Sequence, residues 1–484
     1  MRLFKLLHYF MQIITRKIRK KNIAEIVFTA VTDFGGVYIK LIQFVCLRTN
    51  IIPESEKLRF LSFYDEAPIE NIPIRAFLNN ELGQVKSSQI TFIAEKPFAS
   101  GTFGQVYRAT LISGDDIIVK VKRKHLMSKL RMDFFVLRMF AWIFDMLVEQ
   151  KIIDLQRTLR EFEQSTYQEL DYEIEAKNAD YFFKQLKGHP RIFIPKTYVD
   201  MCTKNVLVQE YVGGIAVTDL IRFNTQHPGT YQTWLKEYYH TDPYEIYTSI
   251  VYDLALQGLH EGIFYADPHP GNIKILPNNR YAYIDFGIVG VSPENRLLYY
   301  KLVSAITKKA SEMDMQEMGS VFLEWGAKSF MQHLEIFDEY FSDEKHSVKE
   351  MIVKRYKAIL ESKRDAFSAF DEEENFFQLC FDIVASGTLL NVKVPEGFLA
   401  SLKTMIVFKS WVAYLEPKYH FMRQTYKRII ADVNPQKLKA SKSETQPTPE
   451  TALEVILDWG EQIAETDLPF QQKFNKQILP NLYV

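Results

Sequence analysis

Residues 265–287 decide the fold and the chemistry of this chain, and they read YADPHPGNIKILPNNRYAYIDFG. A loop of turn-forming residues holds Asp267 and Asn272, a strand-like run follows, and Asp285 begins the triplet Asp-Phe-Gly. Two acids and an amide suit phosphoryl transfer, in which the protein mostly positions groups and neutralises charge. Asp267 would orient or deprotonate an acceptor hydroxyl or a water, while Asn272 and Asp285 would bind Mg²⁺ through hard oxygen atoms. An ordinary turn would use the same residue types, but the second acid behind the strand favours a nucleotide site.

A glycine-bearing loop between two strand-like runs lies upstream, at residues 99–106. Glycine lets the backbone approach phosphate oxygens closely and adopt positive φ, although any hairpin turn can carry two glycines. The alternating residues after the loop argue against a loop that leads into a helix, as in Rossmann and Walker sites. Lys120, on the next predicted strand, is suited to the α- and β-phosphates, although an isolated strand lysine is more often a solvated charge. The candidate nucleotide contacts from the loop are Ala99, Gly101, Thr102, Phe103, Gly104 and Val106.

The hydrophobic pattern divides the chain into four regions. Residues 1–89 form a mostly helical N-terminal extension. Residues 90–212 combine strand-like runs with helices, and residues 213–436 are helical around the strand–loop–strand quoted above. Residues 437–484 hold a linker rich in Ser, Thr, Lys and Pro and then an amphipathic helix. The predicted fold class is therefore α+β.

Composition excludes some classes of protein. The 484 residues carry a formal charge of −1, without the basic excess expected of a general nucleic-acid binder. The three cysteines are widely spaced, which predicts a reducing compartment rather than a disulfide framework or metal cluster. No stretch of about 18 or more residues is free of charge, so we expect no transmembrane helix. The basic, apolar first 24 residues suit an anionic membrane surface, or equally an ordinary first helix.

Several motifs together resemble the UbiB/AarF family of atypical kinases, over roughly residues 30–415. The loop at 265–272 is similar to that family's His-Ala-Asp-Pro-His-Pro-Gly-Asn, with Tyr265 in place of the first histidine. Residues 169–171 match its Glu-x-Asp motif, and Lys40 through Gln43 resemble its Lys-x-Gly-Gln motif. The resemblance implies a protein-kinase-like two-lobed fold, with a small β-rich N-lobe, a helical C-lobe and the N-terminal extension.

The resemblance also implies roles for individual residues. Glu175 would pair with Lys120, as in the lysine–glutamate bridge of kinases. Lys40 and Gln43 would fold back over the active site toward Glu169 and Asp171 as a regulatory segment. If 169–180 is one helix, Asp171 and Glu175 share a face, and lysines from elsewhere would relieve their repulsion. Residues 210–212 would be the hinge that meets adenine through Glu210 and Val212, with Gln209 in the gatekeeper place.

Three substitutions depart from the family pattern. Ile42 replaces the glycine of Lys-x-Gly-Gln, which puts the gating role of that segment in doubt. Gly101 stands where the family's loop has alanine. Glycine makes the loop more like that of ordinary protein kinases and could alter nucleotide preference. Ile118 replaces the small alanine beside adenine, and its bulk would cost nucleotide affinity, about 1–3 kcal/mol for an overfilled site.

The favoured function is an ATP- and Mg²⁺-dependent atypical kinase or ATPase that supports ubiquinone or other isoprenoid-lipid metabolism. The alternatives are a protein kinase acting on Ser or Thr, and a nucleotide-binding scaffold with little turnover. The expected partners are nucleotide, an isoprenoid lipid, an anionic membrane surface and a lipid-biosynthesis protein complex, but no nucleic acid. The expected location is the cytoplasm, peripherally at the inner face of a membrane.

Overall fold

The computed structural model describes most of both predicted lobes and part of the extension. The described ranges are 24–34, 37–48, 69–101, 103–124, 126–147, 155–291, 328–341, 347–362, 396–416, 421–438, 448–463 and 468–477, with positions 8, 9, 12, 296, 297, 300, 301 and 304. Thr102, most of the basic first 24 residues and the linker at 439–447 lie outside them.

The N-lobe is built on a five-stranded antiparallel sheet in the order β1-β3-β4-β6, with β2 paired to β3. Its strands are β1 (Ile90–Ile93), β2 (Ala99–Ser100), β3 (Gly104–Leu111), β4 (Asp116–Lys122) and β6 (Val206–Glu210). The strand-like run after the glycine-bearing loop and the next predicted strand, which carries Lys120, are confirmed as β3 and β4, and they pair as a hairpin with Tyr107 opposite Val119. Both of these side chains are buried in a core shared with helix α5 (Ile74–Ser87). The opposite face of the hairpin, which carries Lys120, is left for the site.

Three helices follow β4, as the pattern at 126–187 predicts: α6 (Leu126–Leu147), α7 (Leu155–Glu169) and α8 (Tyr172–Gln185). Residues 169–180 are not one helix, because helix α7 ends at Glu169 and Leu170 and Asp171 separate it from α8. Asp171 is the N-cap of α8, and its carboxylate accepts the Glu173 N–H at 3.0 Å. An N-cap aspartate satisfies a helix donor that has no partner within the helix, so this residue begins a new helix.

The C-lobe combines two small sheets with helices. In the larger sheet, β5 (Ile192–Phe193), β10 (Arg280–Tyr283), β9 (Ile273–Leu276) and β7 (Ile215–Ala216) lie in that order. In the smaller one, β8 (Ile263–Tyr265) pairs with β11 (Val289–Val291). The helices before β8 are α9 (Val217–Gln226), α10 (Tyr231–Tyr239), α11 (Pro243–Leu256) and a π-helical turn at Gln257–Glu261. The predicted strand–loop–strand is thus a β9–β10 hairpin flanked by β8 and β11.

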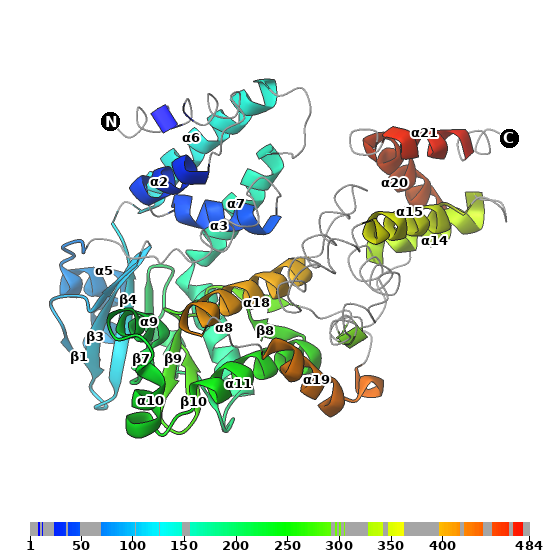
Figure 1. Ribbon diagram of the computed structural model, residues 1–484. Coiled ribbons are helices and arrows are strands. Elements are labelled where there is room, and N and C mark those ends of the chain that lie inside the picture. The colour runs from blue at the N-terminus through cyan, green and yellow to red at the C-terminus, as the bar shows by residue number, and fades with distance from the viewer. Residues whose placement is uncertain are drawn as a thin grey trace.

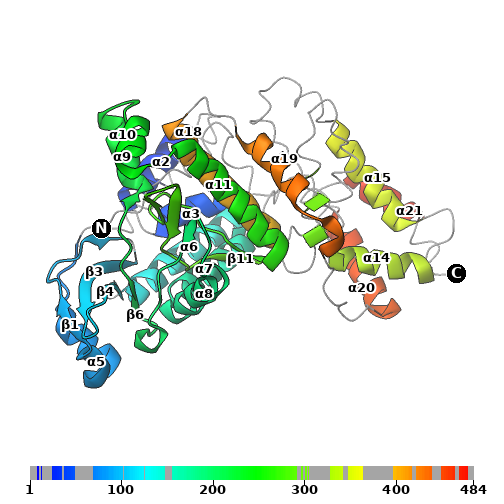
Figure 2. The ribbon, with the colours of Figure 1, turned by 90° about the horizontal axis from the view of Figure 1, so that it is seen from below.

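The remaining helices cover the C-lobe and extend beyond it. Helix α18 (Glu396–Leu415) and helix α19 (Met422–Asp432) lie along α11, and Figure 2 shows the three side by side. Figure 1 places α14 (Lys328–Phe341), α15 (Val348–Glu361), α20 (Pro449–Gln462) and α21 (Leu468–Gln477) together, away from the sheets. The predicted amphipathic helix is α20, whose Ala452 and Ile456 are buried. Helix α21 lacks a counterpart in the sequence prediction.

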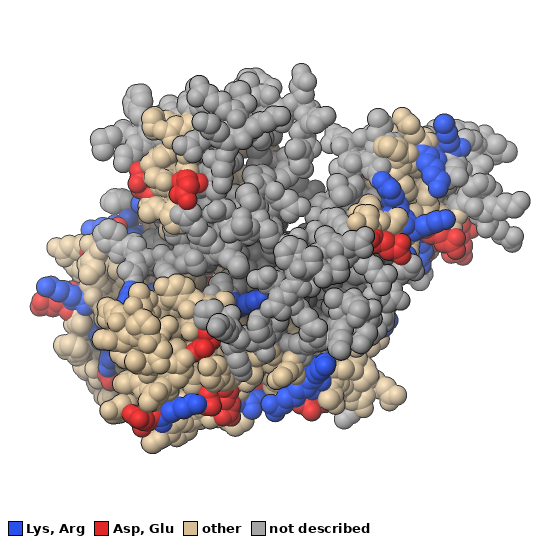
Figure 3. Space-filling view, in the orientation of Figure 1, with Lys and Arg blue, Asp and Glu red and all other residues tan. Residues whose placement is uncertain are grey.

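The extension lies beside the N-lobe. Helices α2 (Ala24–Phe34) and α3 (Val37–Arg48) lie near α6 and α7 in Figure 1, and Val37 and Tyr38 share a buried cluster with Phe134. None of the described helices is long and apolar enough to cross a membrane. On the described part of the face in Figure 3, basic and acidic side chains are interspersed. The boundaries at 89/90, 212/213 and 436/437 stay predictions.

Candidate active site

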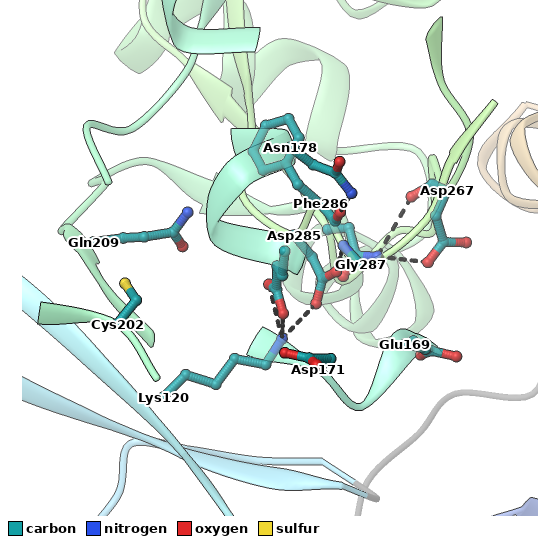
Figure 4. A network of polar contacts seen from close by, with 12 residues as sticks. Lys120, Glu169, Asp171, Asn178, Cys202, Gln209, Asp267, Asp285, Phe286 and Gly287 are labelled. Atoms are coloured by element: carbon teal, nitrogen blue, oxygen red, sulfur yellow. Dashed lines mark hydrogen bonds and ion pairs between the residues drawn. The ribbon is translucent and has the colours of Figure 1, made fainter. Parts of the chain in front are cut away.

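Lys120 on β4 joins two carboxylates from separate parts of the chain. Its Nζ lies 3.0 Å from both carboxylate oxygens of Glu175 on α8 and 2.8 Å from Asp285 Oδ2 after β10. Figure 4 shows the Lys120 ammonium pointing at Asp285. The expected pair of Lys120 with Glu175 is therefore present, and it lies in direct contact with the Asp-Phe-Gly triplet.

Burial and mutual attraction set the charges of this cluster. Burial alone would lower the pKa of Lys120, but Asp285 and Glu175 outweigh burial and raise that pKa well above its usual value. Burial, and then the Asp285 carboxylate, raise the pKa of Glu175 to about 7, against the opposing effect of Lys120. Burial also opposes ionisation of Asp285, yet Lys120 and the Gly287 N–H lower its pKa overall. The cluster therefore keeps Asp285 charged beside a permanent ammonium.

The loop before β9 turns the Asn272 amide toward Asp267. Asn272 Nδ2 donates to Asp267 Oδ2 at 2.9 Å, and the backbone N–H of Asn272 donates to the His269 carbonyl at 2.8 Å. Since the nitrogen of the amide is used in this way, its oxygen is directed elsewhere and is available as a ligand. The predicted acceptor-activating acid and the predicted metal ligand are thus fixed to one another.

Helix α18 supports the same loop from behind. Trp411 Nε1 donates to the Pro268 carbonyl at 3.0 Å, and Thr404 Oγ1 donates to the Ala266 carbonyl at 3.0 Å; both contacts are buried. The carbonyls on either side of Asp267 therefore have fixed partners more than a hundred residues along the chain. Buried backbone carbonyls require such partners, so α18 holds the backbone of Asp267 in place.

Packing and a side-chain amide hold the Asp-Phe-Gly triplet. Phe286 is fully buried and lies 5.4 Å from the Phe182 ring and 5.5 Å from the Tyr265 ring, measured between centroids. Asn178 Nδ2 donates to the Phe286 carbonyl at 3.0 Å, and the Gly287 N–H donates to Asp285 Oδ1 at 3.0 Å. These contacts aim the Asp285 carboxylate at Lys120, and Tyr265, in place of a histidine, serves as a packing surface.

The glycine-bearing loop lies over Tyr172, the first residue of α8. A methyl group on Gly104 would collide with the Tyr172 hydroxyl and lie 2.8 Å from the Val121 carbonyl oxygen. Glycine is therefore required at 104 by this contact, and not by a positive φ as the sequence reasoning allowed. Arg123 braces the loop by donating from Nε to the Gly101 carbonyl at 2.9 Å.

Lys40 of helix α3 reaches the mouth of the site. Its ammonium forms an ion pair with Glu169 and lies 4.2 Å from the centre of the Phe103 ring at the tip of the glycine-bearing loop. Asp171 takes no part in this pair; its nearest cation is Lys204, with 4.0 Å between Nζ and Oδ2. Gln43 lies on the same helix, and its side chain is outside the described residues. The extension therefore covers the loop through Lys40.

Comparison with known proteins identifies the family. The model of the ABC1 atypical kinase-like domain matches residues 63–318, more than half of the chain. The chain belongs to the ABC1 atypical kinase-like family. This assignment confirms the predicted family and the two-lobed, kinase-like α+β fold class.

Relatives in this family cover different shares of the chain. The Arabidopsis thaliana chloroplastic protein ACTIVITY OF BC1 COMPLEX KINASE 1 is 27% identical over 415 residues, which are 83% of this chain and 55% of that protein. The probable protein kinase UbiB of Azotobacter vinelandii is 30% identical over 274 residues, 55% of this chain and 49% of that protein. This chain therefore spans about half the length of these curated relatives.

Among solved structures, the Rv3197–erythromycin complex from Mycobacterium tuberculosis is similar at 19% identity and a TM-score of 0.44. The match covers 83% of this chain and 97% of that chain.

The predicted hinge comprises residues 210–212, with Gln209 in the gatekeeper place. Gln209 is buried and its amide donates to Thr197 Oγ1 at 3.0 Å, so the predicted gatekeeper is tied to the neighbouring chain segment. Ile118 lies opposite Gln209 in the pairing of β4 with β6, on the Lys120 face. Val106 lies opposite Lys120 in the pairing of β3 with β4, two residues from Arg108, the partner of Ile118.

The residues at Asp285 and Asn272 fit a magnesium ion. Mg²⁺ in nucleotide enzymes is held by one or two side-chain oxygens, and phosphates and waters complete the shell. Within the described residues, no group of three or more acidic, His or Cys side chains could hold a metal alone. One carboxylate and one amide oxygen, from Asp285 and Asn272, match the side-chain share of such a shell.

Sequence reasoning missed several residues that position the site. Asn178, Thr404, Trp411 and Tyr172 act through contacts between distant segments. Asn178 alone had a signal, because Asn178 and Ala179 also match the UbiB/AarF family sequence that follows Glu175. The others carry no local pattern that separates them from ordinary helix residues.

Proposed function

We propose that this chain binds ATP with Mg²⁺ and transfers or releases the γ-phosphate. The observation that carries the proposal is the ion pair of Lys120 with Glu175 beside Asp285, because a kinase-like active state requires this lysine–glutamate pair and an aspartate that can hold Mg²⁺. Asp267, whose carboxylate accepts a hydrogen bond from Asn272, would orient the acceptor hydroxyl or water. The family's description as an atypical kinase-like domain supports the same reaction class.

Each residue has a defined task in this proposal. The Lys120 ammonium would exchange its contact with Asp285 for contacts with the α- and β-phosphates, while Glu175 keeps that ammonium oriented. Asp285 and Asn272 would hold Mg²⁺, which neutralises the charge that develops on the phosphate oxygens. Ala99, Gly101, Thr102, Phe103, Gly104 and Val106 would cover the phosphates, and Glu210 with Val212 would meet the base. Lys40, Gln43, Glu169 and Asp171 would regulate access.

The proposed setting is isoprenoid-lipid metabolism, such as that of ubiquinone, at an anionic membrane surface. The motif resemblance to the UbiB family supports this setting. The basic, apolar residues within the first 24 positions are suited to an anionic surface. A lipid-biosynthesis complex and a peripheral cytoplasmic location belong to the same proposal.

Phosphate release under three acceptor conditions tests the proposal. The protein is assayed with Mg·ATP alone, with anionic liposomes that contain an isoprenoid quinone, and with a generic protein substrate. We expect liposomes to raise phosphate release, and we expect no phosphate to be transferred from ATP to the protein substrate. The variant Asp285→Asn should lose nearly all release, whereas Asp200→Asn, an exposed acid that makes no contact with Lys120, should retain it. Equal release by Asp285→Asn and the wild type would refute the enzymatic proposal.

A protein kinase is the second candidate function, and Gly101 favours it because ordinary protein kinases have glycine at this place in the loop. Labelling of the protein substrate in the same assay would select this candidate. Nucleotide binding without any release would instead select a scaffold, the reading that Ile42 and Ile118 favour.

A further inference from the structure

Lys274, in the middle of β9, reaches from the C-lobe to the hinge. Its Nζ donates to the Val212 carbonyl at 2.8 Å and lies 5.1 Å from the centre of the Tyr211 ring. Its neighbours Ile273 and Ile275 point the other way, into the C-lobe core. The lysine is therefore fixed at the place where the proposed nucleotide would present its base.

The backbone pattern shows which hinge groups a base would meet. The Tyr211 N–H donates to the Asp116 carbonyl of β4 at 2.9 Å, so Tyr211 faces that strand. Successive residues of an extended chain face opposite sides, and the Glu210 N–H indeed points away from β4, to the Lys196 carbonyl at 2.8 Å. By the same alternation, the Glu210 carbonyl and the Val212 N–H would face away from β4 as well. Among the described residues neither group has a hydrogen-bond partner.

The free hinge groups are thus one acceptor and one donor, and they match adenine. Adenine would donate from its 6-amino group to the Glu210 carbonyl and accept at N1 from the Val212 N–H. Guanine in the same pose would set O6 against the Glu210 carbonyl and its N1–H against the Val212 N–H. Both contacts would be repulsive. The Glu210 carbonyl and the Val212 N–H would be left without hydrogen-bond partners, which lowers binding affinity strongly.

Guanine could avoid both repulsions by sliding along the hinge by one position. In that pose O6 would accept from the Val212 N–H, and N1–H would donate to the Val212 carbonyl. That carbonyl already accepts from Lys274, whose ammonium would lie beside the positive edge of the guanine N1–H. The slid pose would therefore set a second donor beside the Lys274 ammonium on one carbonyl oxygen, and the repulsion between the two positive groups would weaken it.

Two cations contact the Tyr211 ring in the middle of the hinge. Arg108, on β3 of the N-lobe, has its guanidinium carbon 3.4 Å from the centre of the Tyr211 ring, and Lys274 contacts the same ring from the C-lobe. Tyr211 is thereby tied to strands from both lobes.

We propose that Lys274 is a positioning residue that makes the nucleotide site selective for adenine over guanine. The inference rests on the proposed nucleotide function and goes beyond it, because it assigns base selectivity to one side chain outside the motifs.

Binding of ADP, GDP and IDP with Mg²⁺ to the full chain tests this proposal by calorimetry. IDP has the O6 and N1–H of guanine without its 2-amino group. We expect the wild type to prefer ADP, with GDP and IDP equally weak. Lys274→Met should narrow the ADP-to-GDP ratio by about tenfold, the size expected when one unfavourable polar contact is removed. Lys274→Arg, which keeps a donor, and Lys187→Met, an exposed lysine on the chain after α8, should keep the wild-type ratio.

The outcomes separate this inference from the function on which it rests. If the wild type bound IDP as tightly as ADP, the inference would be overturned. The weak binding of GDP would then come from crowding of its 2-amino group by Ile118, and this comparison needs no variant. Equal ADP-to-GDP ratios in the wild type and a folded Lys274→Met would also overturn it, while nucleotide binding itself would stand. Failure of the wild type to bind any of the three would remove the proposed function together with the inference.

Discussion

At the scale of single residues, Gly104 shows how a motif glycine can be required by a contact inside the protein. The position that a side chain would fill is taken by the Tyr172 hydroxyl and the Val121 carbonyl. We expect Gly104→Ala to lower the free energy of unfolding by about 1–3 kcal/mol, as overpacking does. Denaturant unfolding measures this, and the added change Tyr172→Phe should restore part of the loss. A Gly104→Ala protein as stable as the wild type would contradict the geometry.

Glu175 makes a second residue-scale prediction, on pH. Burial raises its pKa in the folded protein from the ordinary value of 4.5 to about 7, so the folded state holds a proton that the unfolded chain has lost. The stability from this group is present below about pH 4.5 and is lost as pH rises through about 7. We therefore expect the wild type to lose stability relative to Glu175→Gln across this window.

Chemical unfolding at several pH values measures the difference between the two proteins. Glu173→Gln, on the same turn of α8, controls for the loss of a carboxylate. A difference between the wild type and Glu175→Gln that stays constant from pH 4.5 to 7 would contradict the raised pKa.

At the scale of elements, α18 positions the loop that carries Asp267. Trp411→Phe removes the indole donor and leaves the buried Pro268 carbonyl without it, which should cost about 1–3 kcal/mol of stability. Because the loop and not the base site is disturbed, we expect the rate of phosphate release to fall more than ADP affinity. Tyr414→Phe, exposed on the same helix, is the matched control. Losses of equal size in rate and affinity would argue against this positioning role.

Helix α3 makes the other prediction at this scale. Lys40 pairs with Glu169 and covers the Phe103 ring, so it restrains the loop that nucleotide must move. We expect Lys40→Met and Glu169→Gln each to raise ADP affinity severalfold, and the double variant to gain little more because both break one contact. Calorimetry with Lys187→Met as control measures this. Weaker ADP binding in both single variants would show that Lys40 belongs to the binding site instead.

The sequence predicts elements well where periodicity is local. The β3–β4 hairpin, strand β6 and helices α6 to α8 follow from alternation and three- to four-residue spacing. The break at Asp171 was missed because its N-cap role competes with a helical pattern on both sides. The short strands β5 and β7 and helix α21 depend on neighbours far along the chain. Trp411 and Thr404 likewise become recognisable only when α18 is placed against the loop.

At the scale of the whole molecule, the site is assembled from parts that no single element holds. Lys120 comes from the N-lobe sheet, Glu175 from α8, Asp285 from the end of β10, and Lys40 from the extension. The motifs predicted that these residues lie together, because the proposed phosphate chemistry requires it. Their spacing alone did not show that Asp285 would contact Lys120 in the absence of nucleotide, which follows from the charges of the folded cluster.

Thermal unfolding with Mg²⁺ and ADP tests the central claim most directly, that this cluster is a metal–nucleotide site. A ligand at a hundredfold excess over its Kd stabilises a fold by about 2.7 kcal/mol, so the wild type should gain several degrees in Tm. The gain should require Mg²⁺ and ADP together, disappear in Asp285→Asn and persist in Asp200→Asn. A wild-type Tm that does not respond to Mg²⁺ and ADP, or an equal rise in Asp285→Asn, would contradict the claim.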